Sequence, residues 1–150
     1  MTDYHQEVLG QLRAEADNAH VPLPPKSLDT LGGLITDFMP MRSIQCEFPA
    51  SKGNAGLDGR ISLGQMAASA ESVVSLLAYH LSGNPCAAVS FTIHHLRAGE
   101  LDDDRLAVEA KLLHRTKSLV SIDFKVWSGA GRALANGSAT LTVSKSPTGR

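Results

Sequence analysis

A carboxylate that follows a glycine by two helical turns is the feature of this sequence best suited to chemistry. Ser62 and Gln65 have the spacing of a capping box, in which the serine hydroxyl accepts a hydrogen bond from the Gln65 amide and the glutamine side chain reaches back to the Ser62 amide. The Gly64 amide then stays free in the first turn, where the positive end of the helix dipole favours an anion or a polarised carbonyl oxygen. Glu71 follows as a candidate base or nucleophile.

One long helix has to position these groups. Apolar residues recur every three or four positions after Ser62 and predict a helix that ends near Gly83. Glu71 falls at the edge of the apolar stripe, half in and half out, with Ala68 and Ser75 beside it on the same face. The simpler alternative is that the cap motif only begins a helix and that Glu71 is an ordinary surface glutamate.

The segments before this helix predict a leading helix and a pair of strands. Near-helical spacing of apolar residues runs from Asp3 to Ala19, and a proline-rich linker follows. Between Leu31 and Pro49 two short strands are expected to turn near Pro40, and residues 51–60 form a loop into the capped helix. The domain boundaries that follow are 1–30 for the N-terminal helix and linker, 31–145 for the main domain and 146–150 for a polar tail.

After Pro85 the pattern changes to alternation of apolar and polar residues, which predicts four consecutive strands. Short turn-forming segments separate them, a composition suited to antiparallel neighbours, and no strand–helix–strand alternation occurs. The fold class is therefore α+β. Small residues in the last strand are expected to make room for a helix packed across the sheet: Ala133, Ala135, Gly137 and Ala139.

The composition of the chain limits the classes of function. The 150 residues are 43% hydrophobic and 19% charged, which suits one domain with a real core. Fourteen basic and fifteen acidic residues nearly cancel and form no basic run, so nucleic-acid binding is not expected. Cys46 and Cys86 lack metal-ligand spacing, and neither a signal peptide nor a run of about eighteen apolar residues is visible. We expect a cytoplasmic protein with no metal and no membrane association.

The order of elements resembles the hotdog fold, in which a curved antiparallel sheet wraps a central helix. Within that fold, the motifs resemble the phenylacetate-degradation group of acyl-CoA thioesterases, where a loop with Asn and Gly leads to a His-Gly-Gly helix start and an acid follows two turns later. Here Asn54-Ala55-Gly56 occupies the loop, Ser62-Leu63-Gly64 stands at the helix start, and Glu71 keeps the spacing of seven residues after Gly64. Ser62 in place of His and Leu63 in place of the first Gly depart from the pattern.

The resemblance extends from about Leu31 to Val143. Phe91–Gly99 is similar to that family's strand ending in Leu-Arg-Pro-Gly, and Gly131–Ala135 is similar to its hairpin into the last strand. The resemblance implies a thioesterase that acts on an acyl-CoA substrate as a homodimer or a dimer of dimers. It implies no cofactor, because coenzyme A is part of the substrate.

The resemblance also implies roles for individual residues. The Gly64 amide would polarise the thioester carbonyl, and Glu71, reaching in from the other subunit, would deprotonate water or attack directly. Ser75 would hold the water, and Asn54 would orient substrate or water. The remaining candidates would contact the substrate at the helix start or the phosphates of coenzyme A: Ser62, Gln65, Arg97, Arg115 and Lys117.

Two alternatives stay open at this stage. The missing His and Gly favour a non-catalytic hotdog protein that binds an acyl or aromatic ligand. A leading helix before a curved antiparallel sheet also fits a cone-shaped α+β fold of the cystatin-like type, in which the sheet does not enclose the long helix. For single residues the simpler interpretations are a turn-forming Asn54, a surface Ser75, solvated charges at the three cations, and structural roles for His94 and His95.

Overall fold

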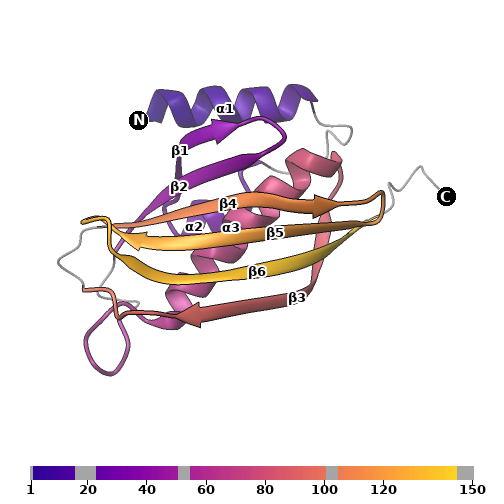
Figure 1. Ribbon diagram of the computed structural model, residues 1–150. Helices are drawn as coiled ribbons and strands as arrows, with labels where there is room; N and C mark the ends of the chain where they lie inside the picture. The colour runs from indigo at the N-terminus through magenta and orange to yellow at the C-terminus, as the bar shows by residue number, and fades with distance from the viewer. Residues whose placement is uncertain (1, 16–22, 51–54, 101–104, 145–150) are drawn as a thin grey trace.

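A computed structural model describes residues 2–15, 23–50, 55–100 and 105–144 and shows a curved antiparallel sheet around a long helix (Figure 1). The elements in chain order are α1 (Thr2–Glu15), α2 (Lys26–Thr30), β1 (Leu34–Met39), β2 (Ser43–Pro49), α3 (Leu63–Ser82), β3 (Cys86–His95), β4 (Arg105–Arg115), β5 (Leu119–Ser128) and β6 (Ala133–Val143). The strands lie in the order β1-β2-β4-β5-β6-β3, and every pair is antiparallel. The predicted hotdog architecture with an extra N-terminal helix is confirmed.

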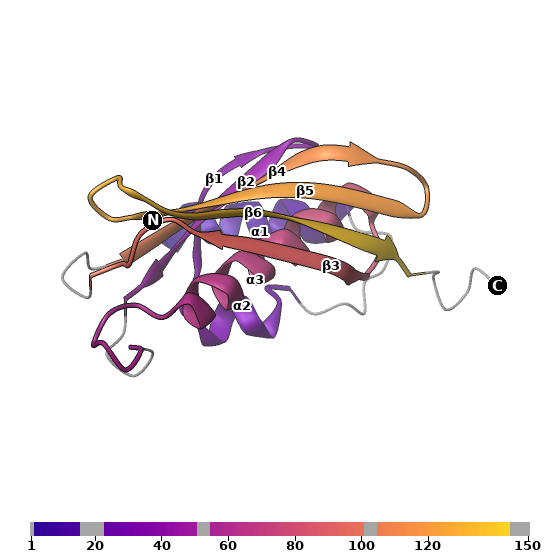
Figure 2. The same cartoon turned by 60° about the horizontal axis from the view of Figure 1, so that its bottom comes forward.

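Figure 2 shows α3 lying along the concave face of the sheet, and the buried side chains of both elements form the core. Successive side chains of a strand point to opposite faces, so alternate residues of each strand meet the helix. The helix contributes the stripe that its spacing predicted: Met66, Ala70, Val73, Val74, Leu77 and Leu81. The central strands contribute Ile44, Cys46, Phe48, Leu106, Val108, Ala110, Val120, Ile122, Phe124 and Val126. Full burial of each large aliphatic or aromatic side chain contributes about 1.5–3 kcal/mol, so this interface carries much of the stability.

The position of β3 differs from the sequence prediction. Turn-forming residues after His95 favoured β4 as its antiparallel neighbour, but β3 pairs with β6 and β4 lies between β2 and β5. The prediction was wrong because turn-forming residues mark where a strand ends without fixing its partner. As a result, within the described ranges, β3 has one edge that no other strand covers.

The small residue in the middle of β6 makes room for the sheet's own groups rather than for α3. A Cβ on Gly137 would lie 2.0 Å from the Thr92 carbonyl oxygen and 2.5 Å from Cζ of Phe124. The Phe124 ring stacks on Phe91 with centroids 5.1 Å apart, which joins β3 to β5 across β6. The expectation that small residues of β6 accommodate the helix therefore does not apply to Gly137, whereas Ala135 and Ala139 are buried in the core against which α3 packs.

The N-terminal segment holds two helices, where the sequence predicted one helix and a linker. The five residues of α2 are too few to leave a periodic pattern. The amide of Ile35 in β1 donates a hydrogen bond to Nδ1 of His5 in α1 at 3.0 Å, which ties α1 to the sheet edge. Burial lowers the pKa of His5, and the nearby charge of Asp29 opposes this effect. Three buried residues of α1 complete the contact: Val8, Leu9 and Leu12.

Candidate active site

The start of α3 is capped by Ser62, as predicted, but only half of the capping box forms. The Ser62 hydroxyl accepts a hydrogen bond from the Gln65 amide at 3.0 Å, with Ser62 itself in an extended conformation. The Gln65 side chain does not return to the Ser62 amide. Its Nε2 instead donates to the Pro49 carbonyl at 3.4 Å, because Gln65 is buried against the end of β2. The helix start is therefore fixed to the sheet as well as capped.

Gly64 occupies the second position of α3 and is exposed. A Cβ added there would meet only Ser62 Oγ, at 3.8 Å, so packing within the protomer does not require glycine. Alanine at this position would favour the helix by about 1 kcal/mol. In the part of the chain that the structure describes, no group accepts a hydrogen bond from the Gly64 amide. A free donor at a helix N-terminus, left bare by glycine, is suited to an oxygen that carries negative charge.

Glu71 lies two turns further along the same exposed face. Its Oε1 accepts a hydrogen bond from the Ser75 hydroxyl at 3.0 Å, as the helical spacing of these residues predicts. Glu71 is exposed rather than half in and half out, while Ser75 is half-buried. The carboxylate is thus oriented by Ser75 on an exposed part of the helix.

Gly64 and Glu71 share a face but are too far apart for one small group to touch both. Seven residues of α-helix rise by about 10 Å at 1.5 Å per residue. The stripe between them contains small side chains, with Ala68 exposed and Ala67 half-buried. The other sides of the helix are covered by the sheet and by the N-terminal segment. One protomer therefore keeps Gly64 and Glu71 apart on the same exposed face of α3.

The described part of the loop before α3 is an ordered turn. Asn54, a candidate catalytic residue, lies outside the described residues. From Gly56 onward, the Gly56 amide donates to the Arg60 carbonyl at 2.7 Å, and the Arg60 amide donates to Asp58 Oδ1 at 3.0 Å. Arg60 also pairs with Glu100 at 3.4 Å. This turn delivers the chain to the helix in a fixed direction.

Ile61 connects the helix start with the segment after β3. It forms bridges to Ala55 and to Gly99, and its amide donates to the Gly99 carbonyl at 2.8 Å. A Cβ on Gly99 would lie 3.0 Å from Cδ1 of both Ile61 and Leu134, so the close approach depends on glycine. The end of β3 and the start of α3 thus form one unit.

The three candidate cations divide between the two ends of α3. Arg97 follows β3 and is exposed near the helix start, since its amide is bound to the Leu134 carbonyl beside Gly99. Arg115 and Lys117 lie at the other end, where the Arg115 guanidinium donates to the Leu81 carbonyl. They line a hollow of about 450 Å³ there. A helix of 20 residues is about 30 Å long, so one protomer does not bring these two cations to Gly64.

The C-terminal end of α3 is closed by contacts within the chain. Gly83 adopts a left-handed conformation at φ 73°, and its amide donates to the Tyr79 carbonyl at 2.7 Å. His80 accepts a hydrogen bond at Nε2 from the Met41 amide at 2.9 Å. Burial lowers the pKa of His80, the charge of Glu15 opposes this, and Arg115 lowers it further. The sequence did not predict the hydrogen bonds that His5 and His80 accept, because their donors are backbone amides far away in the chain.

Neither metal chemistry nor a reactive thiol is indicated in the described ranges. No group of three or more His, Cys, Asp or Glu residues there is placed to hold a metal ion. Cys46 is buried, and burial raises the pKa of its thiol to about 12. Cys86 is half-buried, with Sγ 3.3 Å from the Ser82 hydroxyl, and burial raises its pKa as well. None of the described helices has the length and hydrophobicity of a membrane span.

Comparison with known families decides the relationship. The sequence matches the model of the thioesterase superfamily over residues 58–135, more than half of the chain and including the start of α3 and Glu71. The chain belongs to the thioesterase superfamily. No curated protein sequence matches it significantly.

Solved structures of thioesterase-superfamily type have the same fold. A phenylacetic acid degradation-related protein from Ralstonia eutropha JMP134 is 23% identical, with a TM-score of 0.73, over 89% of this chain and 96% of that one. The E. coli PaaI protein from the phenylacetic acid degradation operon is 16% identical, with a TM-score of 0.71, over 93% and 98%. A mutant thioesterase from Staphylococcus aureus subsp. aureus Mu50 is 18% identical, with a TM-score of 0.72, over 79% and 98%. At these identities the likeness concerns the fold.

Proposed function

We propose that this protein hydrolyses an acyl-CoA thioester in a site shared between two copies of the chain. The observation that carries the proposal is the exposed face of α3, where the free Gly64 amide and the Glu71 carboxylate lie separated on one helix. Membership of the thioesterase superfamily supports the reaction class. The sequence motifs that resemble phenylacetate-degradation acyl-CoA thioesterases, Gly64 and Glu71 seven residues later, favour an acyl-CoA ester as the substrate.

The Gly64 amide supplies the electrophilic half of the reaction. It donates a hydrogen bond to the thioester carbonyl oxygen, and the helix dipole strengthens the interaction as negative charge develops on that oxygen. A single donor of this kind is worth about 10²–10³ in turnover in other acyl-transfer sites. The bare glycine lets the carbonyl approach the amide directly.

Glu71 supplies the other half. As a general base it takes a proton from water while the water oxygen bonds to the carbonyl carbon; as a nucleophile it forms an anhydride that water then hydrolyses. In both routes the carbon–sulfur bond breaks and the products are the free acid and the thiol of coenzyme A. Ser75, bonded to Oε1 of Glu71, holds the carboxylate in place and leaves its other oxygen for the reaction.

A second copy of the chain is needed to complete the site. The free edge of β3 provides the contact, because a strand of ten residues with an uncovered edge is usually paired or shielded in soluble proteins. Val89 on this strand is 61% exposed, as expected for a side chain that a partner covers. Two β3 strands related by a two-fold axis would pair antiparallel, and each α3 would face the other. Glu71 of one copy would then meet Gly64 of its partner, and a dimer of dimers could form from this unit.

The other candidate residues have supporting roles in this proposal. Ser62 and Gln65 hold the helix start, so they position the Gly64 amide beside the substrate. Arg97 is placed to meet a phosphate of coenzyme A at the same end of the helix, whereas Arg115 and Lys117 would do so only for a neighbouring copy. Asn54 would orient substrate or water from the loop.

The direct test measures thiol release from a panel of short, long and aromatic acyl-CoA esters. Wild-type protein is expected to hydrolyse at least one ester well above the uncatalysed rate. Glu71→Gln is expected to lower turnover about 10³-fold, the size of a lost general base, with an unchanged unfolding midpoint because Glu71 is exposed. Glu109→Gln, on the outer face of β4, is the matched control and should leave turnover unchanged. Equal rates for wild type and Glu71→Gln would refute the assignment.

A mixing experiment tests whether the site is shared. Gly64→Ala and Glu71→Gln proteins are unfolded together and refolded as a mixture. Mixed dimers contain one site with both native groups, so about a quarter of wild-type activity should return if copies pair at random. A mixture that stays as inactive as its components would place both groups in the same protomer's site.

A non-catalytic binding protein is the second candidate. It is favoured by Ser62 and Leu63, which stand where the resembled thioesterases have His and Gly. Calorimetry with a non-hydrolysable acyl-CoA thioether separates the two, because binding without turnover of any ester would establish this alternative.

A further inference from the structure

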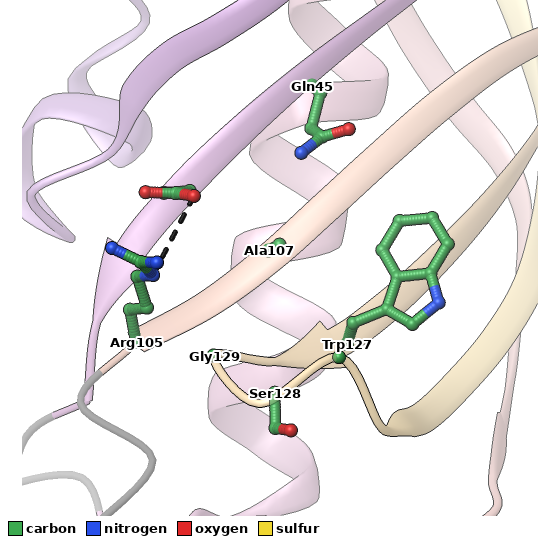
Figure 3. Close-up of a pocket in the computed structure, with 8 residues that line it drawn as sticks. Gln45, Arg105, Ala107, Trp127, Ser128 and Gly129 are labelled. Carbon is green, nitrogen blue, oxygen red and sulfur yellow. Dashed lines mark ion pairs between the residues drawn. The ribbon is translucent and has the colours of Figure 1, made fainter. Parts of the chain in front are cut away.

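A second hollow lies on the opposite face of the sheet from α3, beside Trp127. Trp127 is the single tryptophan of the chain. It sits on the outer face of β5, whose inward positions include Phe124 and Val126. Figure 3 shows its indole ring on one side of the hollow and Arg105, which pairs with Glu47, on the other. An aromatic ring on the outer face of the sheet, next to Gln45 and Glu47, is placed to contact a ligand rather than the core.

The dimensions of this hollow follow from strand register. Glu47, Ala107 and Trp127 form one cross-strand row over β2, β4 and β5. With neighbouring strands about 4.8 Å apart, the backbones of the two outer residues are about 10 Å apart. The floor between them is the methyl group of Ala107, and the hollow measures about 330 Å³. This space admits one flat ring lying against the indole.

The wall opposite Trp127 is polar, and its two charged side chains form an ion pair with each other. Arg105 Nε lies 3.7 Å from Glu47 Oε1, and the two side chains are 53% and 21% exposed. A guanidinium has five N–H donors, so its terminal groups stay available to an anion. Gln45 closes one end of the hollow with an amide that both donates and accepts.

The turn at the other end is rigid. The Ser128 hydroxyl is buried and accepts a hydrogen bond from the Arg132 amide at 3.2 Å, while the Gly131 amide donates to the Ser128 carbonyl at 2.9 Å. Gly131 has φ 82°, a conformation that glycine adopts without strain. The backbone at this end of the hollow is therefore held in one conformation by hydrogen bonds within the turn.

We infer that this hollow binds an adenine nucleotide. The adenine ring stacks on Trp127, its exocyclic amine donates to Glu47 or to the Gln45 side-chain oxygen, and a phosphate meets the exposed guanidinium of Arg105. Stacking on an aromatic ring and an arginine contact to phosphate are the interactions by which proteins hold such groups. The same chemistry is available from free nucleotides and from the nucleotide end of coenzyme A. The second source ties the inference to the proposed substrate, but binding here does not require hydrolysis.

Tryptophan fluorescence provides a direct test, because all of the emission comes from this hollow. Wild-type protein is titrated with coenzyme A, adenosine 3′,5′-bisphosphate, AMP and phosphopantetheine, with excitation where adenine does not absorb. The three adenine-containing compounds are expected to quench the emission saturably, and phosphopantetheine is not. Stronger quenching by the 3′,5′-bisphosphate than by AMP identifies coenzyme A as the source, and equal quenching identifies free nucleotides.

Three variants sharpen the assignment. Ala107→Leu fills the floor and should abolish quenching, whereas Arg105→Gln should weaken binding of the phosphate-bearing compounds at least tenfold. Lys125→Gln removes a cation from the same face outside the hollow and should have no effect. Absence of quenching by every adenine compound, or equal quenching by phosphopantetheine, would overturn the inference. Hydrolysis without quenching would contradict only the nucleotide site beside Trp127. Quenching without hydrolysis would contradict only the proposed thioesterase activity.

Discussion

The two halves of α3 differ in how far their own chain covers them. In the C-terminal half, Leu76–Tyr79 and Leu81 are buried, and the helix end is closed by Gly83 and by the Arg115 guanidinium. In the N-terminal half, Gly64, Ala68 and Glu71 are exposed along one face. Since the two halves belong to one continuous helix, the difference does not come from secondary structure.

The comparison teaches which half the fold needs and which half it leaves for another molecule. A helix end whose polar groups are satisfied within the chain stabilises the protomer. Glycine at position 64 destabilises the helix relative to alanine, and no contact within the protomer requires it. The C-terminal half is therefore covered on all sides by its own chain, whereas the N-terminal half leaves one face open for the proposed substrate and second copy.

Shortening a leucine in each half should give the largest contrast. Leu77→Ala removes a side chain with 0% exposure and should lower the free energy of unfolding by about 2–5 kcal/mol. Leu63→Ala removes one that is 40% exposed and should cost less than about 1 kcal/mol. Urea denaturation measures both values. Similar losses at the two positions would mean that the halves are equally buried in solution.

Replacing glycine by alanine at the two ends of α3 should change the free energy of unfolding in opposite directions. Gly83→Ala forces an L-residue into the left-handed conformation and should cost about 1–2 kcal/mol, without direct effect on turnover. Gly64→Ala should stabilise the helix by up to about 1 kcal/mol, while it lowers thioester turnover by at least about tenfold because the methyl group blocks the amide. Thermal melts and thiol-release assays on both variants check this. Full activity in Gly64→Ala would contradict the proposed hydrogen bond from the Gly64 amide to the thioester carbonyl.

The smallest effect is expected with pH. His5 and His80 have lowered pKa values in the folded chain, so below about pH 6.5 the unfolded chain binds protons first and stability falls as pH falls. At a pH well above 6.5 both histidines are neutral in either state and add no slope. Asp29 and Glu15 reduce the shifts, and Arg115 adds to that of His80. Urea midpoints at pH 7.5 and 5.5 measure the fall.

Neutral acceptors at the same positions provide the control for this prediction. Asn in His5→Asn offers an oxygen near the position of Nδ1, and Gln in His80→Gln offers one near Nε2, so each can still accept its backbone hydrogen bond without titrating. The double variant should show a flatter dependence of stability on pH than wild type. An unchanged slope would assign the dependence to other groups.

The sequence predicted correctly those structural features that depend on residues close together in the chain. The Ser62 cap, the apolar stripe of α3 and the contact between Glu71 and Ser75 all follow from helical spacing. The partner of β3 and the bond from Gln65 to Pro49 did not, because both join segments far apart in the chain. The hollow beside Trp127 was missed for the same reason, since its row of residues exists only once strand register is known.

The bridge of Ile61 to Gly99 has a consequence for how activity would arise during assembly. It links the start of α3 to the segment that follows β3, so in the proposed dimer the pairing of two β3 edges would also help to hold the Gly64 amide in place. Turnover per chain should then rise with protein concentration until all chains are paired through their β3 edges.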